Sequence, residues 1–387
     1  VIFDTAAVTV DNPGILDIND HTETIGSLAG AGGVDLGSGA LTTGGNDADT
    51  LFSGVISGSG TVTKTGAGTM TLSGSNTYTG LTTVEEGVLQ SGADEVLYNS
   101  GALQVVTGGT FDVNGFKETV GSVALVDGTL DDTVGGGLLT ALTYDLQSGQ
   151  VNSSLGEGAI SKTTGGTVVL NATTLASTVD VADGVLQLNQ DERLDDLTAL
   201  AVTGGAFDIN GHSETVNSVT LESGLLDDTV GGGLLTAETY DLQSGQVNSA
   251  LGEGAISKTT SGTVVLNAAT LATTVDITGG LLQLDEDEVI YNTAAVTMSS
   301  GTQLDLNDHT ETIGSLAGAG NVDLGTGALT TGGNDTDTTY SGVISGSGTV
   351  TKTGAGAMTL SGSNTYIGLT TVEEGVLQSG ADEVLYN

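Results

Sequence analysis

The chain repeats itself at a fixed spacing, and this feature limits the folds open to it more than any single residue does. Residues 1–99 return at 289–387 with about five positions in six identical. The stretch LDDTVGGGLLTA occurs at 130–141 and again at 226–237, 96 residues later. A fixed internal period indicates a repeat array in which neighbouring units stabilise one another. We predict one continuous solenoid of four modules in the order A-B-B-A, spanning residues 1–96, 97–192, 193–288 and 289–387.

Each module divides at glycines into pieces of about 17–22 residues, so that about five pieces fill one module. Apolar and polar residues alternate within the pieces, as at Val168 and Leu170 or at Leu186 and Leu188. This period of two is that of a β-strand with one buried face. The 63 glycines suit tight corners between strands, and a single proline leaves the strands uninterrupted. The pattern predicts an all-β fold, a parallel β-helix (β-solenoid) with one coil per piece and about five coils per ~96-residue module.

An array of β-sandwich domains is the alternative architecture, because an immunoglobulin-like domain has about the length of one module. The composition favours the solenoid instead. Aromatic residues make up 3% of the chain, tryptophan is absent, and glycine is dense throughout.

The charge balance is strongly acidic, with 48 Asp and Glu against 6 Lys and Arg and a net charge of −42. Binding to nucleic acid is excluded as a general function, because phosphate contacts need basic side chains. No apolar run reaches the ~18–20 residues of a spanning helix, so we expect no membrane insertion in this segment. Cysteine is absent, which rules out disulfides and thiolate metal sites. The acidic surface is expected to be solvated, or in part to bind divalent cations.

One segment resembles a known family. Residues 53–90, SGVISGSGTVTKTGAGTMTLSGSNTYTGLTTVEEGVLQ, resemble the passenger-associated transport repeat of bacterial autotransporters, also called the autotransporter-associated β-strand repeat. The motif recurs at 341–378, and a diverged version lies at 160–187. The resemblance implies a secreted, right-handed parallel β-helix on the surface of a Gram-negative-type bacterium. No signal peptide is visible at the start of the sequence, and we expect a window of a longer repetitive protein.

Four aspartates are candidate metal ligands. Asp47 and Asp49 lie in GGNDADTLF, and Asp335 and Asp337 lie in GGNDTDTTY. These stretches are similar to the glycine-aspartate repeat that binds Ca²⁺ between coils. The alternative is a hydrogen-bonded Asx-type turn, which we favour because each A module has one copy where a calcium stack needs a tandem run. Calcium is thus the candidate cofactor, and no other is predicted. The same two interpretations apply to Asp131 with Asp132 and to Asp227 with Asp228.

Four lysines occupy one slot of the repeat, [ST]-K-T, once per module. They are Lys64, Lys162, Lys258 and Lys352. Two interpretations follow: an exposed docking stripe for an acidic partner or a neighbouring fibre, or a local surface ion pair that reduces acid repulsion. We favour the ion pair, which contributes about 0–1 kcal/mol when exposed.

Histidine and asparagine also keep fixed places in the repeat. His21, His212 and His309 share one slot, and Phe116 fills that slot in the fourth copy. Because phenylalanine replaces histidine, the slot is predicted to be a turn position without metal chemistry. An asparagine lies just before this slot in every module, where we predict left-handed corners; these are Asn19, Asn114, Asn210 and Asn307.

The function predicted from these observations is structural. We expect an extracellular, fibre-forming repeat segment of a bacterial cell-surface protein (a stalk, sheath, filament or adhesin) that self-associates end to end or laterally. The alternative is a Ca²⁺-dependent adhesive module for a glycan or a host surface. An enzyme is not expected, because Arg193 is the only arginine and each acidic cluster is duplicated with its scaffold.

Overall fold

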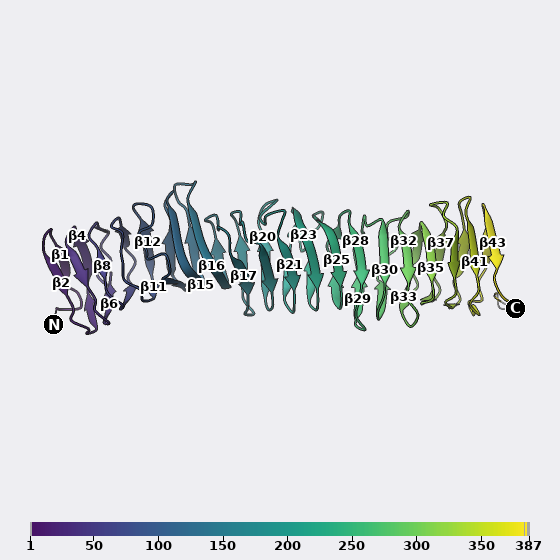
Figure 1. The fold of residues 1–387 in the computed structure, drawn as a ribbon, viewed down its shortest axis with the longest axis horizontal. Helices are drawn as coiled ribbons and strands as arrows, with labels where there is room; N and C mark the ends of the chain where they lie inside the picture. The colour runs from purple at the N-terminus through teal and green to yellow at the C-terminus, as the bar shows by residue number, and fades with distance from the viewer. Residues whose placement is uncertain (1, 383, 385–387) are drawn as a thin grey trace. The chain divides into compact units, whose positions relative to one another are not determined.

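The computed structural model describes residues 2–382 and 384. The chain divides into two compact units, Val1–Thr198 (unit 1) and Ala199–Asn387 (unit 2), and each is described by itself. Every regular element among the described residues is a β-strand (Figure 1). Over this part of the chain, no helix exists that could span a bilayer.

Unit 1 is a parallel β-solenoid whose coils carry three short strands each. Like strands of successive coils pair in parallel and stack into columns: Met70 pairs with Leu89, and Leu89 pairs with Phe111. One coil therefore advances by 19 residues and the next by 22.

The first column of unit 1 contains β1 (Ala7–Val10), β4 (Ser27–Gly30), β7 (Thr50–Phe52), β10 (Thr69–Leu72), β12 (Gly87–Ser91), β14 (Gly109–Asp112), the ends of β15 (Lys117–Asp131) and β16 (Leu138–Val151), β18 (Thr167–Leu170) and β20 (Val185–Leu188). The second contains β3 (Glu23–Ile25), β6 (Ala40–Thr43), β9 (Thr61–Lys64), β11 (Thr82–Val84), β13 (Ala102–Val106), the middles of β15 and β16, β17 (Ala159–Lys162) and β19 (Thr178–Val181). The third contains β2 (Ile15–Asp17), β5 (Gly33–Asp35), β8 (Ile56–Ser57) and, further along the chain, the starts of β15 and β16.

Unit 2 has the same construction, with parallel pairing throughout its described strands. One column contains β22 (Ala206–Asp208), β24 (Leu225–Asp227), β26 (Gly245–Val247), β29 (Thr263–Leu266), β31 (Leu281–Leu284), β33 (Gln303–Asp305), β36 (Asn321–Asp323) and β39 (Ile344–Ser345). A second contains β21 (Ala199–Val202), β23 (Ser213–Leu221), β25 (Leu234–Leu242), β28 (Ala255–Lys258), β30 (Thr274–Ile277), β32 (Ala295–Met298), β35 (Ser315–Gly318), β38 (Thr338–Tyr340), β41 (Ala357–Leu360) and β43 (Val376–Ser379). The third contains β27 (Ala250–Leu251), which pairs with the start of β25, and a group formed by β34 (Thr310–Ile313), β37 (Ala328–Thr331), β40 (Thr349–Lys352) and β42 (Thr370–Val372). The predicted all-β parallel solenoid is confirmed, and the sandwich alternative is wrong.

The interior of each unit is a stack of aliphatic and aromatic side chains. In β18 the side chains of Val168 and Leu170 are buried while their neighbours are not, as the alternation predicts. Along the first column Phe111, Leu130 and Val151 lie above one another and are at most 1% exposed. Each such side chain contributes roughly 1.5–3 kcal/mol by burial, and it does so only because the coils on both sides cover it.

Corners between strands use left-handed backbone. The four asparagines predicted at corners all have positive φ, which confirms that prediction; the values are 50° at Asn19, 52° at Asn114, 51° at Asn210 and 46° at Asn307. At Gly54 a side chain is excluded for another reason. A Cβ built there would lie 1.7 Å from the carbonyl oxygen of Gly32 in the preceding coil.

One coil of each unit is shorter than the others. Thr143 of β16 pairs with Ala159 of β17, only 16 residues later, and Thr239 of β25 pairs with Ala255 of β28 at the same spacing. In unit 1 this short coil lies beside a surface groove that is described below.

Candidate functional site

The four candidate calcium ligands lie at coil corners and bond to the backbone of the next coil. Asp47 and Asp49 accept hydrogen bonds from the amides of Ala67 and Thr69, both at 2.8 Å. Asp335 and Asp337 make the same bonds, both at 2.7 Å, to the amides of Ala355 and Ala357.

The local Asx turn at these corners is made by asparagine. The side-chain oxygens of Asn46 and Asn334 each accept the amide two residues ahead at 3.2 Å. Across residues 2–382 and 384, no group of three or more His, Asp or Glu side chains is placed to hold a metal ion. The aspartates therefore fasten one coil to the next, and calcium binding by them stays a prediction.

The adjacent aspartate pairs organise the TVGGG loops. Asp132 accepts three backbone amides, from Gly115 at 2.6 Å, Gly135 at 3.2 Å and Gly137 at 2.8 Å. Asp228 repeats this arrangement in unit 2, at distances of 2.5, 3.1 and 2.9 Å. A carboxylate with three amide donors is already well solvated by the protein.

The repeated lysines are buried, so the prediction that they are exposed is wrong. Lys64, Lys162, Lys258 and Lys352 are each at most 1% exposed. The Nζ of Lys64 donates to the carbonyl oxygens of Thr65 and Gly66 at 2.8 Å and of Glu86 at 3.1 Å. The other three lysines donate to backbone carbonyls at the equivalent corners.

The cause of this burial is the strand phase. In β9 the residues alternate in and out, so that Val62 and Lys64 both point inward. The Lys64 stem lies in the interior, and its ammonium reaches the corner, where carbonyls converge on it. Burial lowers the pKa of Lys64, and the nearby carboxylates of Glu86 and Asp47 act in the opposite direction. Neither a docking stripe nor a surface ion pair fits this geometry.

Three buried glutamates were missed by the sequence analysis. Glu118, Glu214 and Glu311 are each at most 1% exposed. Glu118 accepts the amides of Val96 at 3.0 Å and Leu97 at 2.8 Å, which belong to the preceding coil. A signal was present, because a glutamate follows two residues after the histidine slot in every module, at Glu23, Glu118, Glu214 and Glu311.

Burial raises the pKa of Glu118 and of Glu311 to about 8, against the effect of the amide donors. A neighbouring glutamate contributes in each case, Glu95 beside Glu118 and Glu288 beside Glu311. In unit 2 the buried oxygens Glu288 Oε2 and Glu311 Oε1 have no hydrogen-bond partner among the described residues. These carboxyl groups therefore favour the protonated form in the fold.

The histidine slot is a turn, as predicted. The amides of His21, His212 and His309 each donate to the carbonyl three residues back, at 2.8–3.0 Å. Phe116 makes the same bond at 2.8 Å. The imidazole of His309 also lies 3.2 Å from Asp287.

Asparagine side chains stack between coils of unit 1. Asn189 Nδ2 donates to Asn171 Oδ1, and Asn171 Nδ2 donates to Asn152 Oδ1, both at 2.7 Å. Arg193 adds to the same corner by donating to the carbonyl oxygen of Asn171 at 3.1 Å. The only arginine of the chain thus bonds to backbone at a coil corner.

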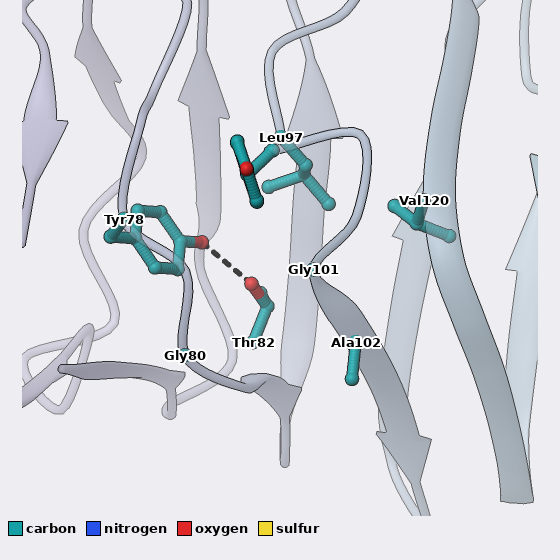
Figure 2. Close-up of a pocket in the computed structure, with 8 residues that line it drawn as sticks. Tyr78, Gly80, Thr82, Leu97, Gly101, Ala102 and Val120 are labelled. Atoms are coloured by element: carbon teal, nitrogen blue, oxygen red, sulfur yellow. Dashed lines mark hydrogen bonds between the residues drawn. The ribbon is translucent and has the colours of Figure 1, made fainter. Parts of the chain in front are cut away.

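A small cavity lies between coils of unit 1 (Figure 2). Tyr78, Leu97 and Val120 line it, and a hydrogen bond of 2.6 Å joins the hydroxyl groups of Tyr78 and Thr82. The space is too narrow to hold a water molecule. Its residues pack the solenoid interior, and the cavity cannot take a ligand.

The polar groups at the coil corners stabilise turns and join neighbouring coils. Together with the parallel strand columns, they identify the chain as a parallel β-solenoid repeat protein. The family model of the passenger-associated transport repeat matches residues 62–90 and 350–378. The chain therefore carries the autotransporter passenger repeat that its sequence resembles, at two places 288 residues apart.

A curated relative matches over most of the chain. The chain is 33% identical, over 391 residues, to "Adhesin BmaC autotransporter" of Brucella suis biovar 1 (strain 1330). The match covers 96% of this chain but 10% of the adhesin. No solved structure matches the chain.

Proposed function

We propose that the chain is a structural segment of a passenger exported to the surface of a Gram-negative bacterium. The observation that carries the proposal is the joining of coils by polar side chains at their corners. Lys64, Asp47 and Glu118 each bond to the backbone of a neighbouring turn. Such bonds fix the spacing of coils. The transport repeat and the autotransporter adhesin relative support surface display.

The segment acts as a non-enzymatic spacer. The coils of each unit form a right-handed solenoid with about five coils per module, and each coil adds ~4.8 Å to its length. The relative is named an adhesin, and it is a protein about ten times longer than this segment. Calcium-dependent glycan binding gains no support from the comparisons.

Self-association end to end or laterally into fibres is part of the proposal, because both units consist of the same kind of parallel coil, repeated many times.

Removal of one module tests the spacer function. Deletion of residues 193–288 joins Glu192 to Val289, which keeps the repeat in phase because Glu288 occupies the position of Glu192. We expect small-angle X-ray scattering to show a maximum dimension shorter by about 24 Å, which is five coils of ~4.8 Å. The shortened chain, fused between a signal peptide and an outer-membrane barrel, should still reach antibody on intact cells.

A matched control is a deletion of residues 193–280, which ends out of phase and should unfold the coils next to the junction. A maximum dimension that does not change on the in-phase deletion would refute the spacer function. Loss of surface labelling by the in-phase deletion alone would instead show that the segment acts in export.

A further inference from the structure

An apolar groove crosses several coils of unit 1 beside the short coil. One part has a volume of about 520 Å³ and is lined by Thr140, Leu142, Glu157 and Ser177 among others. A second part of about 300 Å³ shares Glu157 and Ser177 and continues to Leu175, Asp195 and Leu197. Because the two parts share residues, they form one continuous surface, which we name the leucine groove.

Three leucines of this groove are exposed. Leu142 and Leu197 are each 78% exposed, and Leu175 is 47% exposed. They lie at one corner of nearby coils. The coil of Glu157 lies between those of Leu142 and Leu175, because Leu155 pairs with Leu139 on one side and with Thr174 on the other. The groove runs over five inter-coil spacings from Ser100 to Leu197, which is about 24 Å.

The groove is not a property of the repeat as such. The position of Leu142 is taken by Glu238 in the second B module, and the position of Leu197 is taken by Thr293 at the same place in the next module. Both replacements are polar, and the fold accommodates them. Leu142 and Leu197 are therefore not needed for coil stacking, whereas Leu175 keeps a leucine, Leu271, at its counterpart. We take the exposure of Leu142 and Leu197 as the sign of a contact outside the chain.

The charges around the groove indicate the chemistry of that contact. Glu157 is exposed, Asp195 is half-buried, and both carboxylates line the groove. A second copy of this chain is a poor occupant, because each copy carries −42 and four of its six basic residues are the buried lysines. An anionic lipid surface is disfavoured for the same reason.

We propose that the leucine groove binds a cationic amphipathic segment of a partner protein. Apolar side chains of that segment contact Leu142, Leu175 and Leu197, and its Lys or Arg side chains lie beside Glu157 and Asp195. A length of about 24 Å matches an amphipathic helix of roughly 16 residues at 1.5 Å per residue. The proposal goes beyond the spacer function and does not depend on it.

The test is a binding titration by fluorescence anisotropy on the 387-residue chain at 0.15 M salt. The probe is an 18-residue helical peptide of Leu and Lys, and the comparison peptide has Glu in place of Lys. The groove variant combines L142E and L197T, so that each site receives the residue found at its counterpart in the repeat. We expect its affinity for the Leu-Lys peptide to fall about tenfold, although Leu142→Glu adds a negative charge.

The matched control is Val134→Glu, which adds the same charge at a valine that is 71% exposed and does not line the groove. Its affinity should stay the same or rise. Glu157→Gln combined with Asp195→Asn should weaken binding and reduce its dependence on salt. Circular dichroism melting checks that each variant keeps its fold.

Three results would overturn the proposal. If L142E/L197T binds as well as the parent chain, the peptide is held by the general acidity of the surface. If the Leu-Glu peptide binds equally, the carboxylates have no part in recognition. If sedimentation shows that the parent chain dimerises and L142E/L197T does not, the groove is occupied by a second copy.

Discussion

Replacing Lys64 by methionine should destabilise the coils around it, although the substitution removes a charge from the interior. Methionine keeps most of the stem volume and takes away the ammonium that serves the carbonyls of Thr65, Gly66 and Glu86. A hydrogen bond to a charged group contributes about 1.5–3 kcal/mol. The substitution also removes the desolvation penalty of the buried charge, several kcal/mol, which offsets part of this loss. We expect a net loss of about 2–4 kcal/mol in the free energy of unfolding.

The measurement is urea denaturation followed by circular dichroism, together with amide hydrogen exchange. Because coils touch only their neighbours, exchange should speed up most in β9, β11 and β12 and least in distant coils. Lys117→Met is the matched control, since Lys117 is an exposed lysine.

The salt dependence of stability distinguishes a buried lysine from a lysine in a surface ion pair. Raising the ionic strength to 0.5 M should leave the difference between K64M and the parent chain nearly unchanged, because buried bonds are little screened. The reasoning is refuted if K64M is as stable as the parent chain, or if K117M costs as much as K64M.

Other consequences of the structure can be checked separately. The pKa of Glu118 and of Glu311 is about 8 in the fold against 4.5 in the unfolded chain, so the folded state binds more protons between these values. The contribution of these two groups to stability should be greatest below pH 4.5 and be lost as pH rises through 8, and Glu→Gln at both sites should remove this contribution to the pH dependence in urea titrations. Chelation of calcium by EDTA should leave the melting temperature unchanged, because Asp47 and Asp335 already accept backbone amides; a rise of several degrees on adding Ca²⁺ would contradict this. Phe116→His should change the unfolding free energy by less than about 0.5 kcal/mol, because three copies of this turn already carry histidine, and a loss above 2 kcal/mol would show that the ring of Phe116 is needed for packing.

Much of the fold could be predicted because the same strand and turn patterns recur in every repeat of the sequence. The alternation of apolar and polar residues at Val168 and Leu170 predicted the strand correctly. The asparagine before the histidine slot predicted the corner with positive φ. Parallel stacking followed from the short period, since pieces of about 20 residues have no room for separate sandwiches.

The polar interior could not be predicted in the same way. The alternation in TVTK places Lys64 inward with Val62, but the general cost of burying an ammonium argued for the surface. What removes that cost is a set of carbonyls from residues 65, 66 and 86, and only the coil brings residue 86 beside residue 64. Glu118 is a similar case, because its amide partners lie more than 20 residues earlier in the chain.

The sequence by itself determined the period, the strand phase, the left-handed corners and the absence of disulfides, because these depend on residues close together in the chain. The tertiary structure decided which charged groups are inside and which apolar groups are outside. Lys64 is buried and Leu142 is exposed, contrary to their usual preferences, since burial in a solenoid depends on what the neighbouring coils place at each corner.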